Sequence, residues 1–578
     1  MRLSKLALLA SLTPQLSATP QPVVLGSRSG DQHVIAVGSG SDTSAADFQC
    51  DLPNVLEPSQ DGLPSATDLF GSQDALLKQV SRHSAIVRVP SICYDDLGDF
   101  DSDERWAPFY ELHKVLSEQY PLIHSRFTIE KVNTFGLLYT LKGRDSSLKP
   151  LMLTAHQDVV PVADASTWTH PPFSAHFDGT WLWGRGASDD KNSLTGLMSA
   201  VETLLSQENW VPKRTILIAL GFDEECSGRR GAGYIARHIE STWGNDSIAM
   251  ILDEGGMGLQ LIDGVLYALP AVMEKGHADI WFELHVQGGH SSVPFPHTGI
   301  GIISEIVTTL EENPYKAKLM KGSPIYNHFV CQARYSPDAE PKITKLLKEG
   351  DLEALTEELI SIDRPTHFRL QTSQAVDKIA GGQKINAMPE VVTLGVNYRV
   401  APQNTIPEIQ HNILKYIKPI IKKYHLTIKA FEGDDEFAKY EFANGEWSGD
   451  FAELLGDPLR PFYDVDYNGT LVLSSSQRTL VAPVSPTSGD VWDVLSGTIQ
   501  YSFAFKDGKV VPVGELMTGN TDTRHYLSLT RNIYRWTPTR QGGSDGVHTI
   551  DERMNMTVHL EAVRFYYNLV RNFDTSDA

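Results

Sequence analysis

The chain has 578 residues. Hydrophobic cores stop growing near about 250–300 residues, so a chain of this length forms more than one domain. Apolar residues make up 41% of it and charged residues 21%, which excludes a largely disordered protein. The chain contains 50 Lys and Arg residues and 72 Asp and Glu residues, which gives a net charge of −22. The Lys and Arg residues form no basic run. We therefore expect no nucleic-acid partner and no attachment to an anionic membrane surface.

The N-terminus has the pattern of a signal peptide over residues 1–18. Arg2 and Lys5 precede an apolar run from Leu6 to Leu12, which is far shorter than the about 20 residues of a membrane helix. An uncleaved N-terminal anchor is the alternative, and we expect no transmembrane segment elsewhere. Residues 19–65, which are rich in Ser, Gly, Asp and Pro, are predicted to be a leader and linker.

Two further features bear on secretion. Glycosylation sequons, which agree with a secreted glycoprotein, begin at Asn245, Asn468 and Asn555. The four cysteines contain no CxxC pair, which excludes a thiolate zinc site and a small disulfide scaffold. In a secreted chain Cys50–Cys93 is a candidate disulfide, although the sequence does not assign the connectivity.

A regular pattern of strands and helices begins near residue 73. Apolar residues at helical spacing predict a helix that includes 109–116 and stops near Pro121. Short apolar strands are predicted at 151–155, 215–220 and 248–252. Between the first two lies an amphipathic helix over 194–205, with Ser193 as its possible N-cap. Short apolar strands separated by a long helix predict an α/β sheet with helices on both faces.

A second pattern begins near residue 279. Strands are predicted at 280–286, 391–400 and 426–430, with helices over 303–310 and 409–420 between them. This β-α-β-α-β order predicts a smaller α+β domain, residues 280–500, inserted into the first. The segments 313–375 and 431–500 are predicted to be further insertions within it. Residues 66–279 and 501–578 then form the two parts of the first domain, onto which the last helix docks.

Imidazole and carboxylate groups follow three of the predicted strands. The sequences are His156-Gln157-Asp158, Asp223-Glu224-Glu225 and Asp253-Glu254-Gly255, and residues 184–191 (GRGASDDK) lie between the first two. In an open α/β sheet, ligand sites lie beyond the carboxyl ends of the strands, so these groups are expected to meet at one edge. Carboxylates gathered there repel one another unless a cation joins them. One imidazole with several carboxylates and no thiolate suits zinc or another borderline divalent ion.

These motifs, in this order and spacing, resemble the zinc aminoacylase/carboxypeptidase family of metallopeptidases. GRGASDDKNS and GFDEE are most similar to the carboxypeptidase S (Gly-X carboxypeptidase) branch. The resemblance covers about residues 70–575. It implies a di-zinc exopeptidase-type catalytic domain, a mixed sheet with helices on both faces, and makes the inserted domain a lid and dimerisation domain.

The resemblance also implies two zinc ions per chain and a set of ligands for them. His156 would bind the first zinc, Asp189 would bridge both ions, and Glu225 would bind the second. Either Asp253 or Glu254 completes the first site. The two are adjacent, and we slightly prefer Asp253. The remaining ligand of the second zinc would be His548, within GVHTIDERM.

Further catalytic and substrate-binding roles follow from the same resemblance. Asp158 would hold the His156 ring, Glu224 would be the general base, and His290, within GGHSSVP, would stabilise the oxyanion. Three residues would contact the substrate: Asn386, Arg399 and Arg524. A guanidinium suits a substrate carboxylate, so either arginine is a candidate clamp, although either could instead form a structural ion pair.

The sequence therefore predicts a zinc metallo-carboxypeptidase that hydrolyses the C-terminal bond of short peptides. It would be secreted or located in a vacuolar lumen. The alternative is an N-acyl-amino-acid amidohydrolase, which uses the same site on an N-acyl amino acid. A non-catalytic binding protein is disfavoured because the expected base and ligands are all present. A serine hydrolase is disfavoured because no G-x-S-x-G stands between a strand and a helix. Both a monomer and a homodimer are compatible with the sequence.

Overall fold

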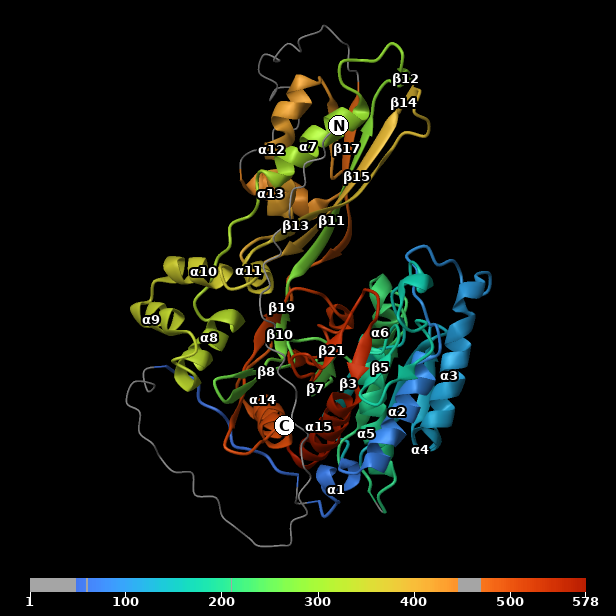
Figure 1. Cartoon of the computed structure of the whole chain (residues 1–578), viewed down its shortest axis with the longest axis vertical. Helices are drawn as coiled ribbons and strands as arrows, with labels where there is room; N and C mark the ends of the chain where they lie inside the picture. The colour runs from blue at the N-terminus through green and yellow to red at the C-terminus, as the bar shows by residue number, and fades with distance from the viewer. Residues whose placement is uncertain (1–47, 59–60, 209, 445–468) are drawn as a thin grey trace, which may run out of the picture. The chain divides into compact units, whose positions relative to one another are not determined.

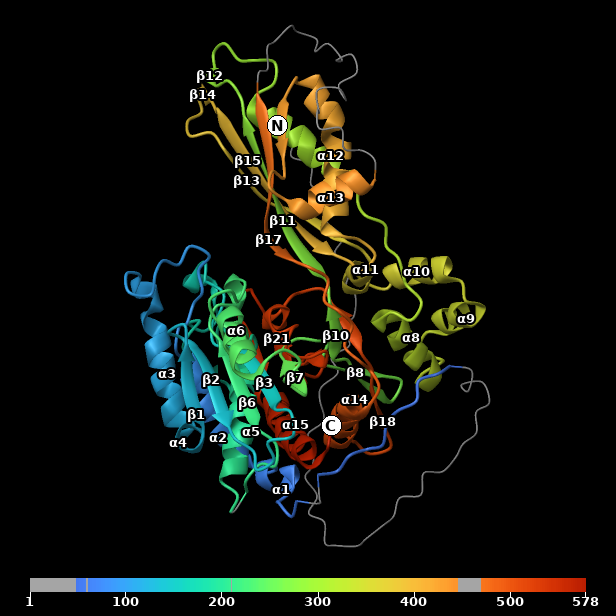
Figure 2. The ribbon, with the colours of Figure 1, turned by 180° about the vertical axis from the view of Figure 1, so that it is seen from behind.

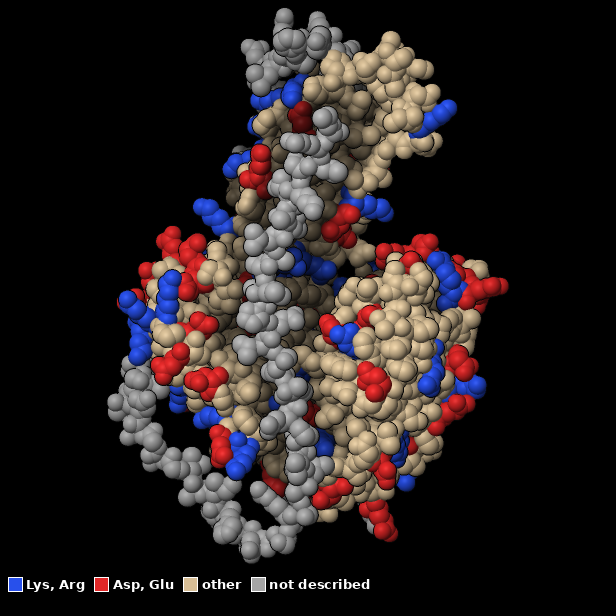
Figure 3. All heavy atoms as spheres, viewed as in Figure 1, with Lys and Arg blue, Asp and Glu red and all other residues tan. Residues whose placement is uncertain are grey.

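The computed structural model describes residues 48–58, 61–208, 210–444 and 469–578 (Figure 1). The predicted signal peptide, most of the leader and the sequon at Asn468 lie outside these residues. Among the helices of the described ranges, none is long and apolar enough to cross a membrane. On the face seen in Figure 3, Lys and Arg side chains are interspersed with Asp and Glu rather than gathered in one basic patch.

An eight-stranded mixed sheet forms the centre of the first domain. Its strands, in spatial order, are β1 (Thr128–Val132), β2 (Gly136–Leu141), β6 (Ile216–Gly221), β3 (Leu151–His156), β7 (Met250–Asp253), β20 (Ile533–Arg535), β10 (Ala271–Glu274) and β19 (Glu515–Met517). β3 runs parallel to both β6 and β7, whereas β1, β2 and β10 pair antiparallel to their neighbours β2, β6 and β20. The predicted α/β class with a mixed sheet is confirmed.

Helices cover both faces of this sheet, as predicted (Figures 1 and 2). One face packs against α2 (Gln73–Val87), α5 (Lys191–Leu205) and α15 (Met556–Thr575), and the other against α6 (Ala232–Trp243). Helix α5 begins before Ser193, because Asp190 is its N-cap and accepts a hydrogen bond from the Ser193 backbone N–H. The suggested Ser193 cap is therefore wrong by three residues.

The inserted sheet has five strands, and we call it, with α7, α12 and α13, the lid domain. In spatial order its strands are β13 (Ser373–Gly381), β15 (Val391–Val400), β11 (Gly276–His285), β17 (Thr470–Thr479) and β16 (Thr427–Ala430). Helices α7 (Gly299–Glu311) and α12 (Ile406–Lys423) pack their apolar side chains against this sheet and form a second core. A short ribbon of β12 (Gly289–His290) and β14 (Ala387–Met388) carries the GGHSSVP motif.

The two segments predicted as insertions pack in different parts of the structure. Four helices occupy 313–375: α8 (Pro324–Tyr335), α9 (Pro341–Glu349), α10 (Leu352–Ile360) and α11 (Arg364–Leu370). They form a cluster of their own with Phe48, Met273 and Leu516, from outside the lid sheet. In 431–500, α13 (Asp435–Ala443) and β17 belong to the lid domain, but α14 (Asp490–Ser502) packs in the first core and contacts α15. The chain thus returns to the first core before residue 500, the predicted end of the lid domain.

Other elements complete the described parts of the chain. They are α1 (Ala66–Phe70), α3 (Ala107–Gln119), α4 (Pro121–Arg126), β4 (His176–Phe177), β5 (Trp181–Trp183), β8 (Leu259–Ile262), β9 (Val265–Ala268), β18 (Lys509–Pro512), β21 (Ser544–Asp545), β22 (Arg553–Asn555) and the 3₁₀ turns η2 (Glu104–Trp106), η3 (Ala165–Thr167), η4 (Glu224–Cys226) and η5 (Asp522–His525). Strands β8, β9 and β18 form one small sheet, and β4, β5, β21 and β22 form another.

Two disulfides join segments that are distant in the sequence, Cys50–Cys331 and Cys93–Cys226. The suggested Cys50–Cys93 pairing is wrong. Cys50 lies against α8, where its carbonyl oxygen accepts a hydrogen bond from the Tyr335 hydroxyl, whereas the Cys93 N–H donates to Val159 beside the main sheet. The two cysteines are thus held against different parts of the chain. The described end of the leader is also fixed, because the Arg571 guanidinium pairs with Asp61.

Candidate active site

The three motifs that follow strands meet at one edge of the eight-stranded sheet. His156 is the last residue of β3, and Asp253 is the last of β7. The turn η4, which contains Glu224 and Glu225, follows β6. Because β3 lies between β6 and β7 and is parallel to both, the ends of these three strands are adjacent. The sheet order thus explains why groups almost a hundred residues apart gather here.

His156 stands at the centre of this group. Its Nε2 atom is 3.1 Å from Asp189 Oδ1 and 3.4 Å from Glu254 Oε1. Ligand-type atoms of His156, Asp189 and Glu225 lie within 4.8 Å of one another, as do those of His156, Glu224 and Glu254. The His156 side chain is 1% exposed, whereas Asp189 and Glu254 are 21% and 15% exposed, so the imidazole is the most buried of the three.

His548 completes the group from the far end of the chain. Its Nε2 atom is 3.1 Å from Asp189 Oδ2 and 3.2 Å from Glu225 Oε1. The two oxygens of Asp189 therefore face different histidines, His156 on one side and His548 on the other. We call His156, Asp189, Glu225, Glu254 and His548 the acidic cluster.

Asp253 and Glu254 point in different directions. The Asp253 carboxylate accepts hydrogen bonds from the Thr154 hydroxyl at 2.7 Å and from the Glu254 backbone N–H at 2.9 Å. Glu254 instead approaches His156. Successive side chains at a strand end alternate in direction, so only one of the two can face the cluster. The geometry therefore favours Glu254, whereas the sequence slightly favoured Asp253.

Asp158 contacts the site mainly through the η4 turn. Its two carboxylate oxygens accept hydrogen bonds from the backbone N–H groups of Glu224 at 3.1 Å and Glu225 at 3.0 Å. The His156 Nδ1 atom is 3.0 Å from the backbone oxygen of Asp158 and 3.4 Å from its carboxylate. Asp158 therefore positions the turn as well as the imidazole ring.

The electrostatics of the cluster fit a bound cation. Burial raises the pKa of Glu224, Glu225 and Glu254, and the neighbouring Asp189 adds to the effect on Glu225 and Glu254. Burial acts to lower the pKa of His156, but Glu254, Asp158 and Asp189 raise it well above its usual value. Hydrogen bonds to Asp189 and Glu225 raise the pKa of His548 to about 10. These carboxylates repel one another unless they are protonated, and a bound divalent cation removes that repulsion. The combination of imidazole and carboxylate donors suits zinc.

Two arginines approach from beside the cluster. The Arg524 guanidinium donates to Glu224 Oε1 at 2.9 Å, in an ion pair whose two side chains are only 12% and 11% exposed. Arg399 donates to Asn520 Oδ1 at 3.1 Å, and its pKa is lowered by burial and by the charge of Arg524. The structure thus brings both predicted arginines to the side of the site where Glu224 lies.

Glu552 is a site residue that was not predicted from the sequence. This fully buried carboxylate accepts four hydrogen bonds: from Arg185 Nη1 at 2.7 Å and from the backbone N–H groups of Gly186 at 2.9 Å, Ser188 at 2.9 Å and Asp189 at 3.0 Å. The Arg185 guanidinium also donates to the Thr549 backbone oxygen, next to His548. Glu552 therefore joins the loop of Asp189 to the loop of His548. Its place four residues after a predicted ligand, in the same motif, is the signal that could have identified it.

Two predicted site residues lie at the β12–β14 ribbon of the lid domain, His290 in β12 and Asn386 directly before β14. His290 is exposed, and its Nδ1 atom is 2.7 Å from the Ser292 hydroxyl. Asn386 is also exposed, and its backbone oxygen accepts a hydrogen bond from the Ser291 N–H. Within the described parts of the chain, no hydrogen bond or ion pair joins either side chain to the acidic cluster.

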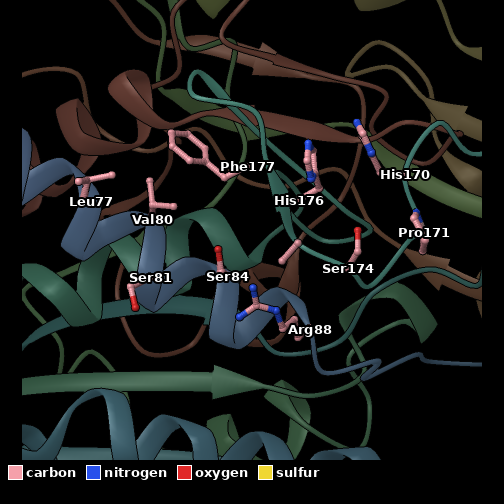
Figure 4. A pocket seen from close by; sticks show the side chains of 11 residues that line it. Leu77, Val80, Ser81, Ser84, Arg88, His170, Pro171, Ser174, His176 and Phe177 are labelled. Atoms are coloured by element: carbon pink, nitrogen blue, oxygen red, sulfur yellow. The ribbon is translucent and has the colours of Figure 1, made fainter.

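A cavity of about 520 Å³ lies elsewhere, between α2 and residues 170–177 (Figure 4). Arg88, His170 and His176 contribute to its wall, together with several serines, and none of the residues that line it is acidic. It shares no residue with the acidic cluster. We therefore assign it no part in the chemistry of the site.

Comparison with known proteins gives a consistent result. The model of peptidase family M20/M25/M40 matches residues 152–572. An uncharacterized carboxypeptidase of Schizosaccharomyces pombe is 37% identical, covering 96% of this chain and 90% of its own length. Carboxypeptidase S of Saccharomyces cerevisiae is 36% identical, covering 85% and 84%. An N-fatty-acyl-amino acid synthase/hydrolase of Mus musculus is 29% identical, covering 85% and 86%.

The fold is similar to that of solved peptidases. Human carnosine dipeptidase 1 superposes with a TM-score of 0.59 at 12% identity, covering 89% of this chain and 100% of its own. At this identity the likeness concerns the fold alone. The extent of the family match and the identity to the two yeast carboxypeptidases decide the assignment. The chain belongs to peptidase family M20/M25/M40 and is a metallopeptidase with a carboxypeptidase-like function.

Proposed function

We propose that the chain is a two-zinc carboxypeptidase that hydrolyses the C-terminal peptide bond of short peptides. The observation that carries the proposal is the acidic cluster at the ends of β3, β6 and β7, with Glu224 beside it. The cluster offers two overlapping sets of donors, since Asp189 directs one oxygen to each histidine.

The donors divide naturally between two ions. His156 and Glu254 would hold one zinc, Glu225 and His548 would hold the other, and Asp189 would contribute to both. When bound, zinc supplies Lewis acidity toward the scissile carbonyl and lowers the pKa of water. We assign Asp253 the supporting role of fixing Glu254, because it accepts a hydrogen bond from the Glu254 N–H.

Glu224 is proposed as the general base. It lies within the site, and ligand-type atoms of His156 and Glu254 approach its carboxylate. It would take a proton from the attacking water and later give it to the leaving amine. Arg524 would orient this carboxylate through the ion pair at 2.9 Å.

The two arginines provide a binding site for the free carboxylate of the substrate. Arg524 is already paired with Glu224, so Arg399 has the greater capacity to accept a second anion. We propose that Arg399 is the clamp, with Arg524 as its neighbour. His290 and Asn386 would act on the oxyanion and on the substrate from the lid domain.

Metal analysis coupled to a peptide assay tests the proposal. The purified protein is expected to bind close to two zinc ions per chain, to lose activity in a chelator and to recover it with zinc or cobalt. It should release the C-terminal residue from an N-blocked dipeptide. A fully active protein without bound metal would contradict the proposal.

The second candidate is an N-acyl-amino-acid amidohydrolase. Its support is the relative named N-fatty-acyl-amino acid synthase/hydrolase, which covers most of this chain. Both reactions cleave an amide whose amine product carries a carboxylate, so they require the same groups. An N-fatty-acyl amino acid assayed beside the blocked dipeptide separates the two, since the favoured substrate shows the higher kcat/KM.

We also propose that the protein works in the secretory pathway, secreted or in a vacuolar lumen. The two disulfides support this, because disulfides persist in oxidising compartments. Asn245 is exposed in the structure, as a glycosylated asparagine must be. Endoglycosidase treatment of protein from its own cells, followed by fractionation, tests both points. Monomer and homodimer remain alternatives for sedimentation to decide.

A further inference from the structure

One disulfide is attached directly to the catalytic turn. Cys226 is the last residue of η4 and follows Glu225 without a spacer. Its partner, Cys93, is 133 residues away in the sequence, and its side chain is buried. Neither the acidic cluster nor the proposed reaction uses this bond.

The partner cysteine belongs to a segment that lies along the end of β3. The Cys93 backbone N–H donates to Val159 O at 3.0 Å, the Val159 N–H donates to Ser91 O at 3.0 Å, and Ile92 forms a parallel bridge with Val159. The Ser91 hydroxyl donates to Gln157 O at 2.7 Å. Residues 91–93 are thus held against 157–159, the segment that contains Asp158.

The other end of the bond is held by Asp158 itself. The Asp158 carboxylate accepts the N–H groups of Glu224 and Glu225, the two residues that precede Cys226. The contacts therefore form a closed ring: Cys93 to the 157–159 segment, Asp158 to the turn, and Cys226 back to Cys93. Of the three links named here between the segments, the disulfide is the covalent one.

We propose that the Cys93–Cys226 disulfide is a positioning element of the metal site, which holds the η4 turn against Asp158 so that Glu224 and Glu225 keep the places that the reaction requires. This inference rests on the proposed function. Without the bond, the contacts that hold the turn against Asp158 are two hydrogen bonds whose N–H donors water can also satisfy, so Glu225 moves relative to His156 and Asp189. Zinc affinity then falls, and Glu224 loses its alignment. The enzyme is consequently expected to work only where disulfides persist.

The chain contains a matched control. Cys50–Cys331 joins the leader to α8, and none of its contacts named above involves the acidic cluster. It closes a sequence separation of 281 residues, against 133 for Cys93–Cys226. The entropic stabilisation from a disulfide grows only with the logarithm of loop length, so the two bonds should stabilise the fold to a similar extent. A purely structural role would therefore make the two disulfides equivalent.

The test compares C93A/C226A with C50A/C331A in the full chain. The melting temperature, the zinc dissociation constant by chelator competition, and kcat and KM at saturating zinc are measured for each. The melting temperatures of both variants should fall by similar amounts. Only C93A/C226A should bind zinc about 10–100-fold more weakly, as for other groups that orient ligands, and show a kcat up to about 100-fold lower with little change in KM. Equal zinc affinity and kcat in the two variants would overturn the inference.

A second measurement covers variants that fail to fold. Folded wild-type protein is treated with a water-soluble phosphine, which reduces a disulfide to two thiols and is itself oxidised to the phosphine oxide with oxygen from water. Alkylation and mass spectrometry identify which bond has opened. Zinc should be lost in proportion to opening of Cys93–Cys226, and retention of zinc after that bond has opened would overturn the inference. If wild-type protein binds no zinc at all, the proposed function fails together with the inference.

Discussion

Glu224 and Glu225 are adjacent in the chain, yet their carboxylates meet different partners. Glu225 faces His548, whereas Glu224 receives the guanidinium of Arg524. Both backbone N–H groups donate to Asp158, so the turn that separates the two side chains is itself fixed. Neighbouring glutamates can therefore have different functions, one as a ligand and one as a base.

Glutamine substitutions separate these two functions. Glu225→Gln removes an anionic ligand, so zinc content and rate should fall together. Glu224→Gln keeps shape and polarity but removes the proton acceptor, so it should retain zinc while kcat falls about 10²–10⁴-fold. Metal analysis and steady-state kinetics on the two variants give the answer. If Glu224→Gln loses zinc and Glu225→Gln retains it, the two roles are reversed.

The same comparison applies to Asp253 and Glu254. Glu254→Gln should weaken zinc binding directly, because its carboxylate lies 3.4 Å from the His156 imidazole. Asp253→Asn keeps an oxygen that can still accept from the Thr154 hydroxyl, so it should retain more zinc. Chelator competition measures both affinities. Weaker binding by Asp253→Asn than by Glu254→Gln would return the ligand role to Asp253.

The sequence could identify this pair but could not choose between its members. Adjacent acidic residues at a strand end give no periodicity that tells which side chain faces the site. The choice depends on where β7 ends and on the Thr154 hydroxyl, which comes from a strand about a hundred residues earlier. His156, Asp189 and His548, by contrast, are predicted from motifs, and in the structure Asp189 lies 3.1 Å from each of the two imidazoles.

At the scale of elements, the loop that carries Asp189 depends on a single buried carboxylate. Glu552→Gln would replace one accepting oxygen with an amide that donates, leaving two of the four donors without a partner. An unsatisfied buried donor costs about 1–3 kcal/mol. We expect a lower melting temperature together with weaker zinc binding, measured by calorimetry and chelator competition.

A matched control for Glu552 is Glu515 on β19, which is equally buried and pairs with His328 of α8 and Arg369 of α11. Glu515→Gln should lower the melting temperature without changing the zinc dissociation constant. If both variants lose zinc affinity to the same degree, the effect of Glu552 is one of general stability.

The β12–β14 ribbon gives a prediction of a different kind. His290→Ala should lower kcat about 10²–10³-fold, as for other lost oxyanion donors, without changing metal content. The residue is exposed and makes a local contact with Ser292, so the substitution should not affect folding. Kinetics and metal analysis of this variant provide the check, and a near-normal kcat would remove His290 from the catalytic residues.

Elements with a strong apolar period were predicted well, and those that depend on distant contacts were not. The strand at 391–400 and the helix over 303–310 appear as β15 and within α7. The placement of α14 in the first core was missed, because the sequence pattern of a helix does not show which of two cores the helix packs against. The disulfides were missed because pairing depends on where Cys93 and Cys226 lie in space, which sequence spacing does not encode.

At the scale of the whole molecule, zinc and protons should compete for the acidic cluster. His156, His548, Glu224, Glu225 and Glu254 all have raised pKa values in the folded metal-free chain. A raised pKa means that the folded chain holds its proton more tightly than the unfolded chain. The free energy of unfolding of the stripped protein therefore falls as the pH rises through these values. The lowered pKa of Asp189 acts in the opposite sense, but only below its usual value of 3.8.

The gain in melting temperature on adding zinc should consequently be larger at pH 7.5 than at pH 5.5. Stripped and zinc-loaded protein are compared at each pH, which cancels titrating groups outside the site, such as the buried Lys275, whose pKa burial lowers to about 7. Scanning calorimetry provides the measurement. A gain that shrinks as the pH rises would mean that the cluster does not exchange protons for metal.

The position of β20 has a consequence for biosynthesis. This strand, residues 533–535, lies between β7 and β10, and α15, which packs on the same sheet, begins only at Met556. While the nascent chain is still emerging from the ribosome, β7 and β10 therefore have no shared neighbour, and the sheet stays open along that gap. His548 follows β20 in the sequence, so it is synthesised later still. The site can form only after residue 548 has been synthesised, so a chain truncated before residue 533 should remain a substrate for chaperones rather than become a smaller enzyme.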